Sequence, residues 1–309
     1  MILCCGEALI DMIPTPTLAG PDGFVPHSGG AVFNTAIALG RLGVQTGMLT
    51  GLSNDMFGRQ LLEALKASHV DTSHVIESEH PSTLAFVRLI DGHATYCFFD
   101  ESSASRMVFE ADLPRLSPEV STLFFGGISL ACEPAAETYA ALLQHAADGR
   151  VVMIDPNIRP RFIKDIDRFR ARLDRMFAAA DIVKLSDEDL NWLIPAPLSQ
   201  REKVATLLDK GISVLVLTQG ANGATGYLAN GDEVHVAAEP VQIVDTVGAG
   251  DTFNAGLLAK LSQLGCLTKP QMADLPQDAL RAALHHGAKV AAVTVSRAGA
   301  NPPWAEDLI

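Results

Sequence analysis

One acidic residue in a glycine-containing segment offers the clearest chemistry in this chain. The segment Asp245–Phe253 connects a run of high β-propensity, Val241–Val244, to a helix-favouring run that begins near Ala249. Gly248 and Gly250 allow the backbone to approach a ligand closely, and the first N–H groups of a helix lack intrahelical acceptors. Such a helix end attracts anions, phosphate among them.

Asp251 is unexpected in a phosphate cradle, because a carboxylate repels phosphate. One explanation is a chemical role in which Asp251 takes the proton from an attacking hydroxyl group. The alternative is an acidic residue in the first helical turn that only complements the helix dipole. A single G-x-G pattern does not distinguish between these two explanations.

A second glycine-led segment, Gly29–Asn34, opens another predicted helix. Its paired glycines permit a close backbone approach, and the Asn34 amide can both donate to and accept from a polyol hydroxyl group. Asp11, which follows the first predicted strand, could accept two hydroxyl hydrogen bonds. The structural alternatives are a glycine turn followed by a polar residue and a solvated acid at a strand end.

Polar residues also follow two strands predicted in the middle of the chain. Asn157 and Arg159 come after one of them and offer donors to an oxygen-rich ligand, although Arg159 could equally balance the surrounding acids. The segment Ser186–Asp189 follows the other and contains three carboxylates, which suit hydrated Mg²⁺. Its spacing also fits a helix-capping box. Further on, Thr218–Gly223 could admit nucleotide phosphates or form a plain hairpin turn.

Short apolar runs alternate with amphipathic stretches along most of the chain. Strands are predicted at Ile2–Cys5, Gly47–Gly51, Thr122–Phe125, Val151–Ile154, Ile182–Leu185 and Val214–Leu217. Helices are predicted at Ala31–Leu42, Phe57–Ala67, Ala135–Ala147, Ile166–Ala179 and Arg201–Asp209. This order predicts a mostly parallel sheet with helices on both faces. Ligands gather at the carboxyl ends of such strands, so the polar segments could line one crevice.

Two regions, approximately residues 13–28 and 83–100, break the alternation. Pro14–Ser28 is rich in turn residues, and Leu84–Leu89 and Ala94–Phe99 flank a turn signal at Asp91-Gly92. We predict that both belong to a small β-flap that acts as a lid. An ordinary edge hairpin is the alternative.

Charge, apolar run length and cysteine usage argue against several classes of protein. The formal charge of −13 argues against a nucleic-acid or anionic-membrane surface. The start of the chain lacks the features of a signal peptide, and no apolar run approaches the length of a membrane span. The five cysteines have no metal-ligand spacing, which predicts reduced, buried thiols in a cytoplasmic protein.

Together these segments resemble the ribokinase-like, or phosphofructokinase-B-type, family of carbohydrate kinases. Two signatures in the family's order carry the resemblance, which extends over nearly the whole chain: Gly29–Gly43 and Asp245–Phe253. The resemblance implies a single domain over 1–309 with a three-layer α/β fold, a mostly parallel central sheet and a β-flap lid. It also implies ATP-dependent phosphorylation of a sugar, with Mg²⁺ and K⁺ as cofactors.

The resemblance further implies roles for individual residues. Asp251 would be the general base, and Gly248, Ala249 and Gly250 would form an anion hole for the transferring phosphoryl group. Sugar contacts are expected from Asp11, Gly29, Gly30, Asn34, Phe99, Asn157, Arg159 and Asp251. Nucleotide contacts are expected from Lys184, Ser186, Thr218, Gly220, Gly223, Gly248 and Gly250. Asp189 would act on Mg²⁺ through water, and a monovalent-cation site is expected at Asp245, Val247 and Gly299.

One departure from the family concerns the metal. Many members carry an Asn-x-x-Glu motif, whereas this chain has Ser186 and Asp189 at the two ends of that motif. The shorter carboxylate puts direct metal contact in doubt. Kinases of the fructokinase type resemble this variant more closely.

The residues Tyr96–Ser105 and Asp155–Arg159 look most like those of bacterial fructokinases, which implies phosphorylation of D-fructose at O6. The alternative is 2-keto-3-deoxygluconate kinase or another ribokinase-like sugar kinase. The former often has an arginine where this chain has Phe98, although Arg106 and Arg159 could serve a substrate carboxylate.

A non-catalytic sugar-binding regulatory protein is the alternative of a different class, and the intact Asp251 argues against it. A dinucleotide-dependent oxidoreductase is disfavoured, because no G-x-G-x-x-G follows the first strand. Since an exposed sheet edge invites pairing, a homodimer through the lid is also expected.

Overall fold

A nine-stranded sheet forms the middle layer of the computed structural model, which describes residues 1–90 and 93–308. Its strand order is β15-β14-β13-β12-β11-β10-β1-β4-β6. The strands are β1 (Ile2–Cys5), β4 (Thr46–Leu49), β6 (Val70–Asp71), β10 (Thr122–Gly126), β11 (Val151–Asp155), β12 (Ile182–Ser186), β13 (Val214–Thr218), β14 (Ala224–Leu228) and β15 (Glu233–Val236). All neighbours from β6 to β13 pair in parallel, whereas β14 and β15 add an antiparallel edge. The predicted parallel sheet is confirmed.

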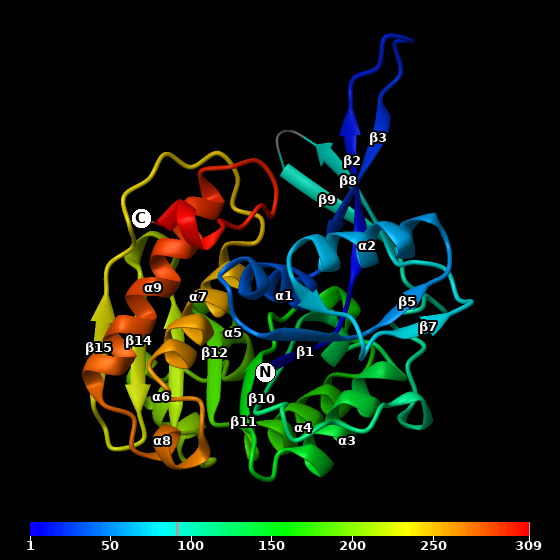
Figure 1. Ribbon diagram of the computed structural model, residues 1–309. Coiled ribbons are helices and arrows are strands. Elements are labelled where there is room, and N and C mark those ends of the chain that lie inside the picture. The colour runs from blue at the N-terminus through cyan, green and yellow to red at the C-terminus, as the bar shows by residue number, and fades with distance from the viewer. Residues whose placement is uncertain (91–92, 309) are drawn as a thin grey trace.

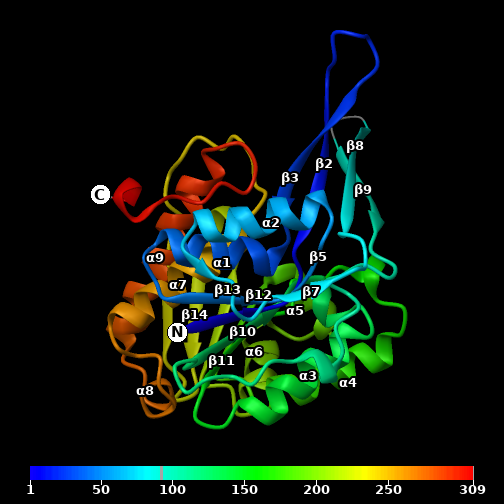
Figure 2. The same cartoon turned by 45° about the vertical axis from the view of Figure 1, so that its right-hand side comes forward.

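Helices cover both faces of this sheet, as Figures 1 and 2 show. One face is covered by α1 (Ala31–Arg41), α2 (Met56–Ala67), α7 (Ala249–Gln263), α8 (Lys269–Ala273) and α9 (Gln277–Val295). The other is covered by α3 (Ala135–Ala146), α4 (Ile166–Phe177), α5 (Asp187–Leu193) and α6 (Gln200–Leu208). Successive strand residues point to opposite faces, so neighbouring Cys4 and Cys5 lie in different apolar clusters. This is the predicted three-layer arrangement.

The sequence analysis does not predict α9, which contains a glycine in its middle. Gly287 lies where α9 crosses α7 at close range. A Cβ atom on Gly256 of α7 would come within 2.8 Å of the Cα atom of Gly287. The glycines therefore allow two helices to pack closely, at a cost in helix propensity of about 1 kcal/mol each.

Four strands form the predicted flap, in the order β3-β2-β8-β9. They are β2 (Leu9–Thr15), β3 (Gly23–Gly29), β8 (Leu84–Ile90) and β9 (His93–Phe99). The flap rises from the body of the molecule beside α2 (Figure 1). The antiparallel pairing of β8 with β9 confirms the hairpin, and the predicted turn at Asp91-Gly92 lies outside the described residues. A smaller pair, β5 (Gly51–Ser53) and β7 (Ile76–Ser78), lies at the base of the flap.

One sequence-based expectation is wrong, and one run of high β-propensity does not form a strand. Val241–Val244 forms no strand, and the side chains of Ile243 and Val244 are 63% and 60% exposed. Its high β-propensity has no effect because the segment has no strand to pair with; Val244 N instead donates to Val295 O at the end of α9. Cys97, on the flap, is exposed rather than buried, whereas the other four cysteines are buried.

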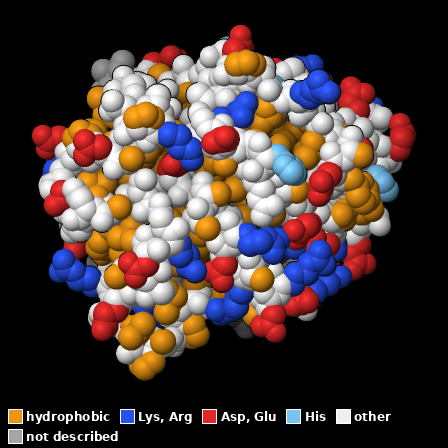
Figure 3. Space-filling view, turned by 90° about the horizontal axis from the view of Figure 1, so that it is seen from below, with side chains coloured by type: hydrophobic (Ala, Val, Ile, Leu, Met, Phe, Trp, Pro, Cys, Tyr) orange, Lys and Arg blue, Asp and Glu red, His pale blue; other side chains and the backbone are white. Residues whose placement is uncertain are grey.

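Charged groups of both signs share the surface opposite the flap. In this view acidic and basic side chains alternate with apolar and uncharged ones (Figure 3). Among the described residues, no helix has both the length and the apolar character that crossing a membrane requires.

Candidate active site

A cleft of about 450 Å³ opens where the flap meets the carboxyl ends of the parallel strands. Residues after β1 and β11 line it together with the N-terminal turns of α1 and α7. The cleft therefore brings together these residues predicted from the sequence: Asp11, Gly30, Asn34, Asn157, Arg159, Lys184, Val247, Gly248, Ala249, Gly250 and Asp251. The parallel topology explains this convergence, because all these strands end at the same edge of the sheet.

The start of α7 places Asp251 in this cleft. Gly248 is the N-cap residue and has a left-handed backbone with φ of 80°. A Cβ atom there would also lie 2.8 Å from the Cβ atom of Ala300. A residue other than glycine would therefore be strained in two ways, and the helix could not begin at this point in the same direction.

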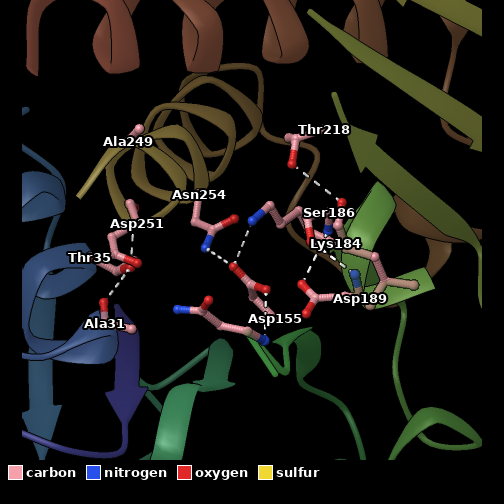
Figure 4. A network of polar contacts seen from close by, with 12 residues as sticks. Ala31, Thr35, Asp155, Lys184, Ser186, Asp189, Thr218, Ala249, Asp251 and Asn254 are labelled. Carbon is pink, nitrogen blue, oxygen red and sulfur yellow. Dashed lines mark hydrogen bonds and ion pairs between the residues drawn. The ribbon is translucent and has the colours of Figure 1, made fainter. Parts of the chain in front are cut away.

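Two side chains of α1 hold Asp251 from the opposite side. The Asn34 side-chain amide donates to Asp251 Oδ2 at 2.9 Å, and the Thr35 hydroxyl donates to the Asp251 carbonyl oxygen at 3.1 Å. Figure 4 shows Thr35 and Ala31 on the α1 side of Asp251. The two glycine-led segments identified in the sequence therefore meet at one carboxylate.

Burial alters the acidity of Asp251. The side chain is almost entirely enclosed, and desolvation raises the pKa of Asp251 to about 7. The hydrogen bond from Asn34 and the charge of Lys184 lower this pKa, while the charges of Asp155 and Glu7 raise it. A carboxyl group with a pKa near 7 can accept a proton at neutral pH far better than an ordinary aspartate.

A buried cation lies next to the same helix end. Lys184 Nζ forms an ion pair of 2.9 Å with Asp155 Oδ2, and the Asn254 side chain donates to that oxygen at 2.7 Å (Figure 4). A Cβ atom on Gly250 would lie 3.2 Å from Lys184 Nζ. The lysine ammonium group thus faces the N-terminal turn of α7, where the free N–H groups of a helix lie.

The residues predicted to bind magnesium have a structural role in this state. The Ser186 hydroxyl accepts from Asp189 N at 3.0 Å, while Asp189 Oδ2 accepts from Ser186 N at 3.2 Å. The other oxygen, Asp189 Oδ1, accepts from Ile158 N at 2.9 Å. The capping-box alternative is therefore present, and both carboxylate oxygens are bound to backbone amides.

The predicted nucleotide turn lies outside the 450 Å³ cleft. It joins β13 to β14 and includes a 3₁₀ turn at Gly220–Asn222. Gly223 has φ of 84°, and a Cβ atom there would lie 2.1 Å from the carbonyl oxygen of Val236. Position 223 must therefore be a glycine, because a side chain there would collide with β15. Gly220 is in open space, and the Thr218 hydroxyl donates to Leu185 O at 3.3 Å.

The structure also brings the three residues of the predicted monovalent-cation site together. Asp245 Oδ1 accepts from Val247 N at 3.0 Å, and Asp245 Oδ2 accepts from Gly299 N at 2.9 Å. These contacts tie the loop before α7 to the loop after α9. Both hydrogen bonds are donated by backbone amides, so they do not test for a cation, and the monovalent-cation site stays a prediction.

On the flap side, two neighbouring aromatic residues of β9 differ in their position relative to the cleft. Phe98 lines the cleft, whereas Phe99 is 60% exposed and packs against Phe86 with ring centroids 5.6 Å apart. Gly29, predicted to contact sugar, instead lies against Asp11: a Cβ atom on Gly29 would be 2.4 Å from Asp11 Oδ2. Asp11 itself lines the cleft, and burial raises its pKa to about 6.

Sequence reasoning gave no individual role in this site to Glu7, Asp155 or Asn254. Glu7 lines the cleft, Asp155 accepts from Lys184, and Asn254 donates to the same Asp155 oxygen. A signal was present for Asn254, which stands three residues after Asp251 and so lies on the same side of α7. Asp155 ends a buried strand and Glu7 follows one, yet their partners come from distant parts of the chain.

The fold and the cleft together define a class of protein, the α/β carbohydrate kinases with a strand flap over the substrate cleft. The family model described as pfkB family carbohydrate kinase matches residues 1–307, and the chain belongs to this family. The resemblance inferred from the two signatures is thereby confirmed.

One relative and two solved structures are similar to this chain over most of its length. A fructokinase from Rhizobium leguminosarum bv. trifolii is 53% identical over 281 residues, covering 91% of this chain and 86% of the relative. The structure of a fructokinase with bound ATP from Xylella fastidiosa matches with a TM-score of 0.91 and 28% identity, covering 100% and 97% of the two chains. A double-mutant fructokinase from Vibrio cholerae O395, with fructose, ADP and potassium bound, matches with a TM-score of 0.83 and 26% identity, covering 97% and 93%.

The raised pKa of Asp251 predicts that this residue destabilises the fold at neutral and alkaline pH. In the folded state its pKa is about 7, compared with an unperturbed value of 3.8. Stability therefore falls as pH rises from about 4 to about 7, because the unfolded chain releases this proton near pH 4 while the native state keeps it until about pH 7. We expect Asp251→Asn to raise the melting temperature at pH 8 by more than at pH 5. Calorimetric unfolding at both pH values measures this, and equal shifts would contradict it.

Proposed function

We propose that this protein transfers the γ-phosphoryl group of ATP to the primary hydroxyl at O6 of D-fructose. The observation that carries the proposal is Asp251, a buried carboxylate with a pKa of about 7 at the N-terminal turn of a helix. Proton acceptance and phosphate binding can then occur side by side. The relatives named as fructokinases support the choice of sugar.

In the proposed reaction Asp251 accepts the proton of the sugar hydroxyl. The hydroxyl oxygen forms a bond to the γ-phosphorus, the bond from that phosphorus to the β,γ-bridging oxygen breaks, and ADP leaves. Lys184 and the backbone amides of the first turn of α7 stabilise the negative charge on the phosphoryl oxygens. Asn34 keeps the carboxylate of Asp251 directed into the cleft through its 2.9 Å hydrogen bond.

Mg²⁺ fits this site through the nucleotide rather than through a protein cage. Among the described residues, no group of three or more histidine, cysteine, aspartate or glutamate side chains could hold a metal ion. Asp189 offers no free carboxylate oxygen, so it would act on Mg²⁺ through water, while phosphate oxygens supply the direct ligands. When bound, Mg²⁺ neutralises phosphate charge. Potassium at Asp245, Val247 and Gly299 stays a prediction.

The cleft has no excess of positive charge that would favour an acidic sugar over a neutral one. Three carboxylates, Glu7, Asp11 and Asp251, line it beside the three cations Arg159, Arg161 and Lys184, and carboxylates accept hydroxyl hydrogen bonds but repel a substrate carboxylate. Arg106, one of the two arginines considered for an acidic substrate, forms an ion pair of 2.8 Å with Asp100 and lines a neighbouring cleft instead. Arg159 remains in the sugar cleft, so 2-keto-3-deoxygluconate is the alternative substrate to exclude.

The flap supports two further proposals. Phe98 of β9 packs against Phe162 of the body, with ring centroids 4.6 Å apart, so the flap can close the cleft as a lid. Its other side exposes Phe24 and Phe99, on either side of Phe86, and this apolar surface supports a homodimer through the flap. A cytoplasmic location is proposed from the cysteine usage.

A substrate panel tests the proposed reaction. With ATP and Mg²⁺, we expect kcat/KM to be highest for D-fructose among D-fructose, 2-keto-3-deoxygluconate, D-ribose and adenosine. The panel is repeated with and without K⁺, and phosphorus NMR of the product locates the phosphate at O6. A preference for any of the other three acceptors would reject fructose. Absence of transfer to every acceptor would instead favour a non-catalytic sugar-binding protein.

The role of Asp251 predicts a separation between turnover and binding. We expect Asp251→Asn to lower kcat by about 10²- to 10⁴-fold, the usual effect of losing a general base. Titration calorimetry should still detect sugar binding, because asparagine preserves the shape of the side chain. In the comparison variant Asp11→Asn, a sugar contact is lost and KM should rise more than kcat falls. Near-normal turnover of Asp251→Asn would remove Asp251 from the role of base.

Lys184 is expected to stabilise the transferring phosphoryl group. We predict that Lys184→Met lowers kcat by about 10²- to 10³-fold, comparable to the loss of one donor that stabilises transition-state charge. Lys203→Met is a matched control, because Lys203 is 7% exposed against 5% for Lys184 and bonds to Asn191 Oδ1 outside the cleft. Equal kinetic effects of the two substitutions would show that Lys184 has only a structural role.

A further inference from the structure

Glu7 is a buried carboxylate that the proposed reaction does not use. It follows β1, is 4% exposed and lines the sugar cleft. Its two oxygens accept backbone amides from two different segments: Oε1 from Ala31 N at 3.0 Å, and Oε2 from Ser129 N at 3.2 Å. Ala31 is the first residue of α1, and Ser129 belongs to the 3₁₀ turn Gly127–Leu130 after β10. One side chain thus links three segments at the edge of the sheet.

The charge of Glu7 is stabilised by amides and not by a cation. Among the described residues, no lysine, arginine or histidine forms an ion pair with Glu7. Two cations that line a cavity together with Glu7 are engaged elsewhere: Arg106 bonds to Asp100 and to the carbonyl oxygen of Glu133, and Lys184 bonds to Asp155. Burial consequently raises the pKa of Glu7, while the amides of Ala31 and Ser129 lower it.

The surrounding backbone is shaped to accommodate this carboxylate. Gly127 has φ of 66°, and a Cβ atom there would come within 2.0 Å of Glu7 Oε1. Gly30, on the other side, has φ of 108°, and its Cβ atom would lie 3.3 Å from Glu7 Cγ. Behind the carboxylate is a chamber of about 10 Å³, lined in part by Thr83, Ser103 and Ser105, large enough for about one water molecule.

The amide that Glu7 holds lies one turn before the residues that hold Asp251. Asn34 N donates to Gly30 O at 2.8 Å, which closes the first turn of α1 directly above the contact with Glu7. The side chains of Asn34 and Thr35 then reach Asp251. We propose that Glu7 is a positioning residue, which fixes the first turn of α1 so that Asn34 holds the Asp251 carboxylate in the cleft. This inference rests on the proposed role of Asp251 as base.

Glu7 also contributes a negative charge near the base. The charged and polar groups that act on Asp251 are Asn34 of α1, Asp155 of β11, Lys184 of β12 and Glu7 itself. Of these, Asp155 and Glu7 raise the pKa of Asp251, and Asn34 and Lys184 lower it. Loss of the Glu7 charge lowers the pKa of Asp251, whereas release of Asn34 raises it, and the Asn34 hydrogen bond has the larger effect. If Glu7 positions Asn34, removing Glu7 should therefore move the acid limb of the pH–rate profile to higher pH.

Glu7→Gln tests the inference with little change in shape. Glutamine turns one of the two oxygens into a donor that faces a backbone N–H, so one hydrogen bond and the charge are lost together. We expect kcat for the sugar to fall by about tenfold to a hundredfold, the scale of a hydrogen bond to a charged group. KM for ATP should stay unchanged, and the acid limb of kcat/KM should move above that of the wild-type enzyme, because Asp251 loses the hydrogen bond from Asn34.

Asp55→Asn provides the matched control. Asp55 caps α2 by accepting Phe57 N at 2.9 Å and Gly58 N at 2.8 Å, and it lies outside the sugar cleft. This variant should lose thermal stability while keeping kcat and the acid limb of the wild-type enzyme. Wild-type kinetics in Glu7→Gln would overturn the proposal. Equal losses in both variants with an unmoved acid limb would also overturn it, because they would show a general structural effect.

Hydrogen exchange separates this inference from the proposed function. Mass spectrometry of the peptide spanning 30–36 should show faster amide exchange in Glu7→Gln than in the wild-type protein, and no such change in Asp55→Asn. Unchanged exchange in Glu7→Gln would overturn the positioning role, whatever the activity. If the wild-type protein phosphorylates no acceptor in the panel, the proposed function fails, while faster exchange would still support Glu7 as the residue that fixes α1.

Discussion

The hydrogen bond between Asn34 and Asp251 is the contact on which the site depends. It joins residues 217 positions apart in the sequence and lies where the N-terminal turns of α1 and α7 meet. Both helices begin at glycines with positive φ, Gly30 and Gly248, because the chain must turn sharply from the sheet edge into each helix. Two helix N-termini that converge on one cleft create a positive potential there, and an anionic ligand can use it. The same potential makes a carboxylate at this point tolerable.

Buried charge is the main energetic cost of this arrangement. Asp155 and Lys184 lie in the interior as a pair, and Asn254 bonds to the same carboxylate oxygen. Replacing such pairs by apolar residues often leaves a protein equally stable or more stable, so stability alone does not explain them. Lys184 borders the cleft and Asp155 holds it in place, so the pair keeps a cation where phosphate charge would be neutralised. Burial raises the pKa of Asp251 to about 7, so this residue also lowers the stability of the fold at neutral pH while suiting the proposed proton transfer.

Local sequence patterns predict the fold well because its signals are local. Apolar runs such as β13 identify buried parallel strands, and the glycine-led segments identify the two helix starts that line the cleft. Contacts between distant residues are not visible in this way, which is why Asp155, Asn254 and Glu7 were missed. Val241–Val244 forms no strand despite its high β-propensity, because this propensity requires a neighbouring strand to take effect. Phe98 lines the cleft and the predicted Phe99 does not, because in a strand one residue decides which face a side chain occupies.

The flap and the body contribute to the cleft in different ways. The catalytic candidates lie on α1, α7 and the strand ends, which the central sheet fixes in place, whereas Phe98 lies on a sheet that rises away from the body. Phe98 contacts Phe162, and both rings line the neighbouring cleft with Arg106 as well as the sugar cleft. The ring pair is therefore a shared wall between the two clefts. A movement of the flap that separates the rings would open the sugar site to water and to the second cleft at once. In the proposed reaction, closure and exclusion of water would depend on the flap, while the geometry of the proposed reacting groups depends on the sheet.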